Sequence, residues 1–264
     1  MPYTQTPKLP ESHTKFANDG EPKLHLLTKG TPNGLKVHAL LEELREAYPE
    51  NSKLAYDFVD IQFDKKEQKS PEFLEVNPNG RIPALVDDNV KDPATGKGHN
   101  VFESASILIW LVENYDTDNK FWFKDQILRS KAFSWIFFGH GGKCRRYVSS
   151  TSPYSGDKRL MIRCWTHART SQPLLVSNLS LKNTHVLTNS RYAPEKIPYG
   201  IKRYQEETRR LFDVVEDGLK AGKGEYLVGD KYSIVDISSE SLVYQLASHH
   251  TIHFHRPSPS FILY

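Results

Sequence analysis

The sequence predicts an α/β domain followed by an all-α domain. Between residues 23 and 115, apolar runs alternate with segments of helical period in the order strand, helix, strand, then strand, strand, helix. After the polar linker 116–119 the strand-like runs stop. An apolar stripe of helical spacing then keeps one face from residue 201 to residue 219. The chain therefore divides into a first half built on a sheet and a helical second half.

The first strand and helix are predicted from an apolar run and a helix cap. Residues 24–27 form the apolar run, Thr31 is a suitable cap, and Pro32 suits the first helical position. The helix that follows has one apolar stripe: Val37, Leu40, Leu41 and Leu44. Residues 56–61 are typical of a second strand, and residues 70–74 of a short helix.

A possible peptide-binding edge follows in the next strand. Residues 77–80 contain Asn, Pro and Gly, which are turn formers, and residues 82–86 are an apolar strand-like run. Pro83 has no N–H to donate to a ladder, so we expect a sheet edge with a cis Ile82–Pro83 bond and an outward amide on Ile82. Such an edge can bind the backbone of a ligand.

A hairpin and a helix complete the first half. Residues 87–100 contain Pro93 and two glycines, which predicts a hairpin with an exposed tip. A helix is predicted from Glu103 to Tyr115, with Ser104 and free backbone amides at its start, where carboxylates bind favourably. The alternative is an ordinary strand, turn and capped helix with no binding role.

The second half is predicted to be helical. Residues 125–139 are predicted to form a helix that is unusually rich in aromatic side chains. Ser233, with Asp236 three residues on, forms a capping-box variant in which Asp takes the usual place of Glu. Both residues are therefore expected to be structural.

Two segments depart from these patterns, residues 143–190 and residues 240–264. The first contains eight Lys or Arg residues and one acid, Asp157, so it carries +7 and the rest of the chain −4. One hypothesis is that both segments are translated introns, because the codons for 142–144 and for 239–241 can each contain a splice-donor hexamer. The alternative is a genuine basic insertion that binds an acidic partner.

Composition excludes several classes of function. No apolar run approaches the roughly 18 residues of a membrane helix, and residues 1–20 lack the apolar core of a signal peptide, so we expect a cytoplasmic protein without a membrane partner. The net charge of +3 is the sum of +7 in the basic segment and −4 elsewhere, and it predicts no nucleic-acid partner. Neither Cys144 nor Cys164 belongs to a CxxC motif. The histidines between 249 and 255 lack accompanying Cys or carboxylate ligands, so no metal is predicted.

Several of these motifs, in this order and spacing, resemble those of glutathione transferases. They are Lys23–Leu27, Gly30–Gly34, Gln68–Phe73, Asn77–Leu85 and Phe102–Ser104. The chain most resembles the Nu-class bacterial enzymes and the fungal group that includes the yeast nitrogen-catabolite regulator. Residues 1–21, rich in Pro, Thr, Ser and Lys, are predicted to be a tail or strap. The resemblance implies a thioredoxin-like glutathione-binding domain at 22–116 and a helical-bundle domain at 120–239. It does not extend to 143–190 or to 240–264.

The resemblance also implies which residue activates the thiol of glutathione. Most of the superfamily uses Tyr or Ser, and neither occurs at this turn. The subgroup uses Thr and Asn, so Asn33 is the expected catalytic residue, assisted by Thr31 and by the amides of the helix start. The alternative is that Asn33 only occupies the first helical turn.

The remaining site residues are carried over in the same way. The backbone of Ile82, next to Pro83, would pair with the cysteinyl unit of glutathione. Glu103 would face the ammonium of the γ-glutamyl end, and Ser104 its carboxylate. Two further residues would reach the glycyl end or line the cleft, although a surface role is an equal alternative: Arg81 and Gln68.

The resemblance implies glutathione as a co-substrate, no metal, and a homodimer. Subgroup members with Asn are weak at conjugating electrophiles and tend to reduce disulfides or hydroperoxides, so a small disulfide, peroxide or electrophile is the expected second substrate. One alternative is a regulatory protein that binds a transcription factor. Residues 1–21 contain only Gln5 and Asn18 of the Asn/Gln type, unlike the tail of that regulator. A second alternative is an inactive product of a mis-spliced gene.

Overall fold

The computed structural model describes residues 13–16, 21–143, 198–221 and 225–239. A five-stranded sheet occupies the first half, in the order β1-β3-β2-β4-β5. Its strands are β1 (His13–Phe16), β2 (Leu24–Thr28), β3 (Tyr56–Asp60), β4 (Ala84–Lys91) and β5 (Gly98–Phe102). β2 and β3 are parallel, and the other pairs are antiparallel.

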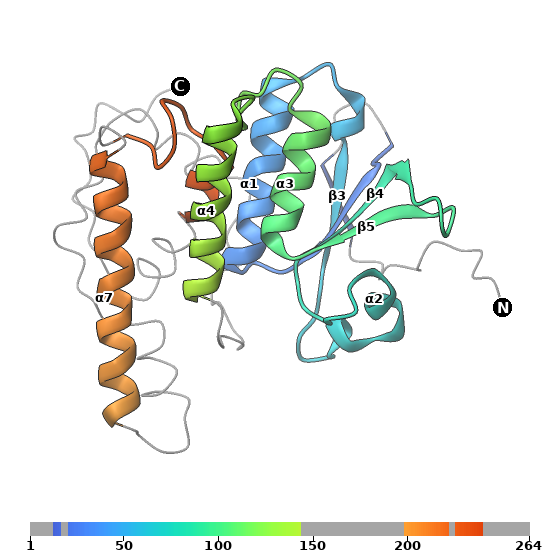
Figure 1. The fold of residues 1–264 in the computed structure, drawn as a ribbon. Coiled ribbons are helices and arrows are strands. Elements are labelled where there is room, and N and C mark those ends of the chain that lie inside the picture. The colour runs from blue at the N-terminus through green and yellow to red at the C-terminus, as the bar shows by residue number, and fades with distance from the viewer. Residues whose placement is uncertain (1–12, 17–20, 144–197, 222–224, 240–264) are drawn as a thin grey trace, which may run out of the picture.

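Helices cover both faces of this sheet (Figure 1). The described helices are α1 (Pro32–Ala47), α2 (Pro71–Val76), α3 (Ser104–Tyr115), α4 (Gln126–Lys143) and α7 (Pro198–Ala221), with 3-10 turns η1 (Ser52–Leu54) and η2 (Glu67–Lys69). Figure 1 shows α1 and α3 side by side, with α4 next to them and α7 outermost. The βαβ-ββα order is that of a thioredoxin-like domain, as predicted.

Alternation along the strands produces two cores. In β2, Leu24 and Leu26 belong to a large core under α1 and α3, whereas Leu27 belongs to a smaller core under α2. This is the period of two expected of strands buried on both faces. The large core continues into the helical half through aromatic residues such as Trp122, so both halves pack as one body of apolar side chains.

The sequence analysis predicted a tail or strap over residues 1–21. In the structure, residues 13–16 form β1, which pairs antiparallel with β3 in the register Phe16↔Tyr56. Residues 1–12 and 17–20 lie outside the described part of the chain. The added strand covers the β3 edge of the sheet, where backbone groups would otherwise be unpaired.

In the second half, the segment 225–239 packs against α4. Residues 234–239 are helical. The Asp236 carboxylate accepts hydrogen bonds from the Ser233 N–H at 2.9 Å and from the Ser233 hydroxyl at 3.0 Å, and the Ser233 hydroxyl accepts from the Val235 N–H at 3.3 Å. Burial raises the pKa of Asp236, although these hydrogen bonds oppose the rise. Of the anomalous segment 143–190, residues 144–190 lie outside the described residues, as does the tail 240–264.

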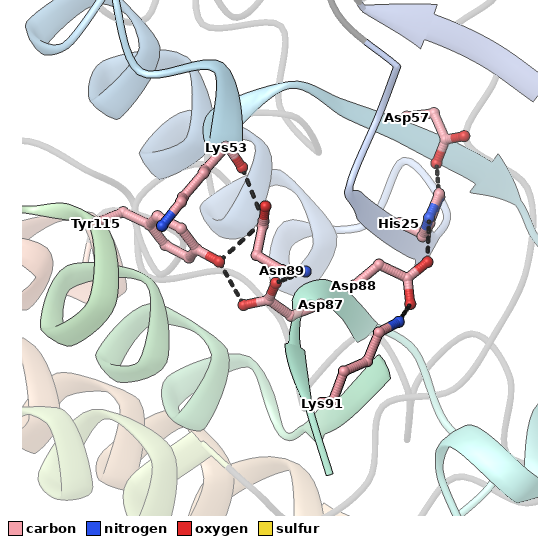
Figure 2. A network of polar contacts seen from close by, with 8 residues as sticks. All are labelled: His25, Lys53, Asp57, Asp87, Asp88, Asn89, Lys91 and Tyr115. Atoms are coloured by element: carbon pink, nitrogen blue, oxygen red, sulfur yellow. Dashed lines mark hydrogen bonds and ion pairs between the residues drawn. The ribbon is translucent and has the colours of Figure 1, made fainter. Parts of the chain in front are cut away.

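A polar network closes the end of the sheet where β2 begins (Figure 2). The Asp87 carboxylate is fully buried and accepts from the Trp110 indole N–H at 2.8 Å and the Tyr115 hydroxyl at 2.6 Å. Beside it, His25 lies between Asp57 and Asp88, at 2.8 and 3.2 Å. Each of these carboxylates therefore has a defined partner.

Candidate glutathione site

The first part of the site is the start of α1. The Thr31 hydroxyl caps the helix by accepting from the Gly34 N–H at 3.3 Å, and Pro32 follows in the first turn. Asn33 is exposed, and its side chain has no hydrogen-bond partner among the described residues. Gly34 lies against the end of β2: a Cβ there would be 2.2 Å from the Thr28 hydroxyl oxygen. The turn is thus packed tightly beneath Asn33.

The second part is the turn before β4. The Asn77 side chain shapes it, because its amide donates to the Arg81 carbonyl at 2.6 Å and its oxygen accepts from the Asn79 N–H at 2.9 Å. The Ile82–Pro83 bond is cis, as predicted. Within the described part of the chain, the main-chain N–H of Ile82 makes no hydrogen bond.

The third part is the start of α3. Glu103 has φ +70° and ψ 122°, a conformation that costs a residue with a side chain on the order of 1–3 kcal/mol. Its carboxylate accepts from the Asn79 side chain at 3.2 Å, which links this helix start to the β4 turn. Ser104 follows and is only 4% exposed. Strain of this kind is concentrated at functional sites.

The two residues expected near the glycyl end differ in their surroundings. The Gln68 side-chain oxygen is buried and has no hydrogen-bond partner among the described residues. Arg81 is exposed, and its guanidinium has no ion pair within the same set. Gln68 lies close to the β4 turn, since its carbonyl would be 2.9 Å from a Cβ at Gly80.

The sheet register brings these parts together. Leu27 pairs with Ala84, and Ala84 pairs with Phe102, so the loops that follow β2, precede β4 and follow β5 lie at one end of the sheet. All the predicted glutathione residues belong to this end or to the neighbouring η2 turn. Ser233 and Asp236 do not, because they belong to the helical half.

Sequence reasoning missed two residues at this end, Lys36 and His140. Lys36 is 1% exposed, and its ammonium lies 3.5 Å from the Ser104 hydroxyl oxygen. His140, from α4, places Nε2 3.1 Å from the same oxygen. The available signal was the spacing of Lys36 from Leu40 and Leu44, which places a lysine on the apolar stripe of α1.

The described residues contain no group of three or more His, Cys, Asp or Glu side chains arranged to hold a metal. Their helices include none with the length and apolar character needed to cross a membrane. Both cysteines lie outside the described ranges.

Comparison with known proteins shows the family of the chain. Residues 22–113 match the family model for the glutathione S-transferase N-terminal domain. The disulfide-bond oxidoreductase YfcG of Escherichia coli is 30% identical over 79% of this chain and 73% of its own length. The disulfide-bond oxidoreductase YghU of the same organism is 31% identical over 86% of this chain, which spans 62% of the length of YghU. The chain belongs to the glutathione transferase family.

Solved structures show the same fold. The glutathione transferase URE2P6 of Phanerochaete chrysosporium, in complex with oxidized glutathione, has a TM-score of 0.61 and 30% identity, and the match covers 86% of this chain and 80% of that one. Ure2p in complex with glutathione has a TM-score of 0.60 and 26% identity, with 84% and 83% covered. The relatives thus include both Nu-class-like bacterial proteins and Ure2-like fungal proteins.

Proposed function

We propose that this protein uses the thiolate of bound glutathione to reduce small disulfides or hydroperoxides, with weak conjugating activity. The observation that carries the proposal is the convergence of three groups at one end of the sheet: the exposed Asn33, the N–H of Ile82, which has no partner among the described residues, and the strained Glu103 before Ser104. Each suits a different part of a γ-glutamyl tripeptide. The names of the bacterial relatives, disulfide-bond oxidoreductases, support the same chemistry.

Activation of the thiol falls to the start of α1. A thiol of this kind has a pKa of about 8.5, and each unit of lowering requires about 1.4 kcal/mol of preferential interaction with the thiolate. The Asn33 amide and the unsatisfied N–H groups of a helix start supply donors of that strength. Thr31 assists by holding the first turn in place through Gly34.

The rest of the tripeptide would occupy the edge formed by β4 and α3. The N–H and C=O of Ile82, next to Pro83, would pair with the cysteinyl backbone as an added strand does. Glu103 would bind the ammonium, and the hydroxyl and N–H of Ser104 the carboxylate. At the glycyl end, the buried oxygen of Gln68 would accept from the glycyl N–H, and the guanidinium of Arg81 would bind the carboxylate.

The reaction then needs two glutathione molecules. With a disulfide, the first thiolate attacks one sulfur, forms a mixed disulfide and expels the other sulfur as a thiolate. With a hydroperoxide, it attacks the terminal oxygen and releases an alcohol, leaving a sulfenic acid. A second glutathione resolves either product to glutathione disulfide, with loss of the second thiol or of water. The bound oxidized glutathione of the relative URE2P6 is consistent with this product.

The test uses the full chain. It should be retained on immobilised glutathione, and its thermal midpoint should rise with added glutathione or glutathione disulfide, because a ligand of the folded state stabilises it. Asn33→Ala should lower turnover of a small disulfide and of cumene hydroperoxide by about 100-fold, in line with loss of a donor to a developing charge. Asn114→Ala, in the last turn of α3, is the matched control. Failure of the folded wild type to bind either ligand would exclude the proposal.

A further inference from the structure

Lys36 joins the two helices that form the proposed glutathione site. It lies one turn beyond Asn33 on α1, and its side chain reaches across to the first residue of α3. The ammonium nitrogen lies 3.5 Å from the Ser104 hydroxyl oxygen. Because an ammonium has only donors, Ser104 must accept this hydrogen bond. The contact therefore orients the Ser104 hydroxyl, with a lone pair of its oxygen toward the Lys36 ammonium.

His140 holds the same hydroxyl from a third helix. Its Nδ1 lies 3.0 Å from the carbonyl of Ile136 one turn earlier in α4. A carbonyl only accepts, so Nδ1 carries the proton, and in the neutral ring Nε2 is an acceptor. In that neutral form, Nε2, at 3.1 Å, accepts a hydrogen bond from the Ser104 hydroxyl. A carboxylate is a stronger acceptor than a neutral ring and can take that proton when a ligand binds.

The electrostatics of this arrangement favour an anion. Burial of an ammonium is costly, and Lys36 is 1% exposed. The start of α3 is also positive, because its first N–H groups have no partners within the helix. A carboxylate bound at Ser104 would lie next to both of these positive groups.

We propose that Lys36 is a positioning residue for the α-carboxylate of the γ-glutamyl end: it orients the Ser104 hydroxyl and supplies a buried positive charge beneath the carboxylate. The proposal deepens the function proposed above and rests on it. His140 holds the same hydroxyl until a ligand carboxylate takes its place as acceptor. Lys36 acts through Ser104, so its contribution depends on whether the ligand carries that carboxylate.

The test compares two ligands by calorimetry. One is glutathione, and the other is 4-aminobutanoyl-cysteinyl-glycine, which keeps the amine and thiol but lacks the α-carboxylate. Wild type should bind the analogue at least about 10-fold more weakly than glutathione, which is the usual effect of losing hydrogen bonds to a charged group. Lys36→Met should weaken the binding of glutathione by a similar factor, and the binding of the analogue by less than about 2-fold. The preference for the carboxylate should therefore be nearly abolished in the variant.

Controls separate positioning from structure. Lys91→Met removes the same charge at the opposite end of β4, where Lys91 pairs with Asp88, and should leave both affinities unchanged. Should Lys36→Met not fold, Lys36→Gln and Ser104→Ala test the same loss of preference. Equal weakening of both ligands by the Lys36 variants would overturn the positioning role while leaving the proposed function in place. Wild type that binds neither ligand would instead overturn the proposed function and this inference with it.

Discussion

At the end of the sheet where β2 begins, Asp87 is buried with a partner for each oxygen, and His25 lies between two carboxylates. At the opposite end, the N–H of Ile82 and the side-chain oxygen of Gln68 have no hydrogen-bond partner among the described residues. Buried polar groups are nearly always paired, so the buried oxygen of Gln68, which lacks a partner within the described ranges, points to a ligand. The same sheet thus carries a closed polar network at one end and open donors and acceptors at the other.

Backbone conformation differs in the same way. At the open end, Glu103 has a φ of +70° and Gly34 touches the end of β2 too closely for any side chain. Strained residues persist where the surrounding structure holds them. Changes at the network should therefore affect stability alone, whereas changes at the open end should affect binding as well.

The largest expected effect is that of Asp87→Asn. The amide N–H groups of the new Asn would face donors in either orientation: the Trp110 indole and the Tyr115 hydroxyl, or the Asn89 main-chain N–H. Leaving such groups buried without acceptors should lower the free energy of unfolding by about 3 kcal/mol, measured by denaturant unfolding. Asp88→Asn, next in the chain and partly exposed, should cost less than about 1 kcal/mol. Similar losses for the two variants would contradict the importance of the Asp87 network.

Gly34→Ala should have the next largest effect. Its Cβ would lie 2.2 Å from the Thr28 hydroxyl oxygen and 2.6 Å from the Lys29 carbonyl oxygen, so the start of α1 must move away from the sheet. We expect a loss of about 2 kcal/mol of stability together with weaker glutathione binding. Gly30→Ala is the matched control, since nothing lies within 4 Å of a Cβ at that position. Unchanged stability in Gly34→Ala would show that the turn accommodates the methyl group.

Glu103→Gly should separate stability from binding. Glycine adopts positive φ readily, so relief of strain should raise the free energy of unfolding by about 1 kcal/mol. Loss of the carboxylate should weaken glutathione binding about 10-fold, because a charged partner of the ammonium is removed. Asn119→Gly, at φ +58° and outside the site, should change stability only slightly and binding not at all. A variant that is both more stable and fully able to bind would exclude Glu103 from the site.

Much of the fold was predictable because local chemistry determines it. The cap at Thr31 and the apolar stripe of α1 define that helix, and the proline and turn residues before β4 define its start. Alternation of apolar residues places β2 in the sheet. These signals lie within a few residues of the elements that they predict.

The remaining features depend on partners that are far away in the sequence. The strand β1 is defined by pairing with β3, about forty residues on, and its own residues carry little strand signal. Lysine is usually a surface residue. The burial of Lys36 depends on α3 and α4, which lie 68 or more residues later in the chain. Asp87 likewise meets Tyr115 across 28 residues. Spacing alone does not predict such contacts.

The smallest expected effect is the pH dependence contributed by His25. Burial lowers the pKa of this histidine, but hydrogen bonds and charge from Asp57 and Asp88 outweigh burial and raise it above 6.5. The charged ring therefore stabilises the folded state fully below pH 6.5, and this contribution is lost as the pH rises through the higher folded-state pKa. Compared with His25→Gln, wild type should be more stable by about 1 kcal/mol in mild acid, and the difference should shrink in alkaline buffer. Asp88→Asn should shift that change to lower pH, since it removes one of the two carboxylates that favour the charged ring. A difference that grew with rising pH would mean that His25 is neutral in the folded protein, and the closed network would then depend on Asp87 alone.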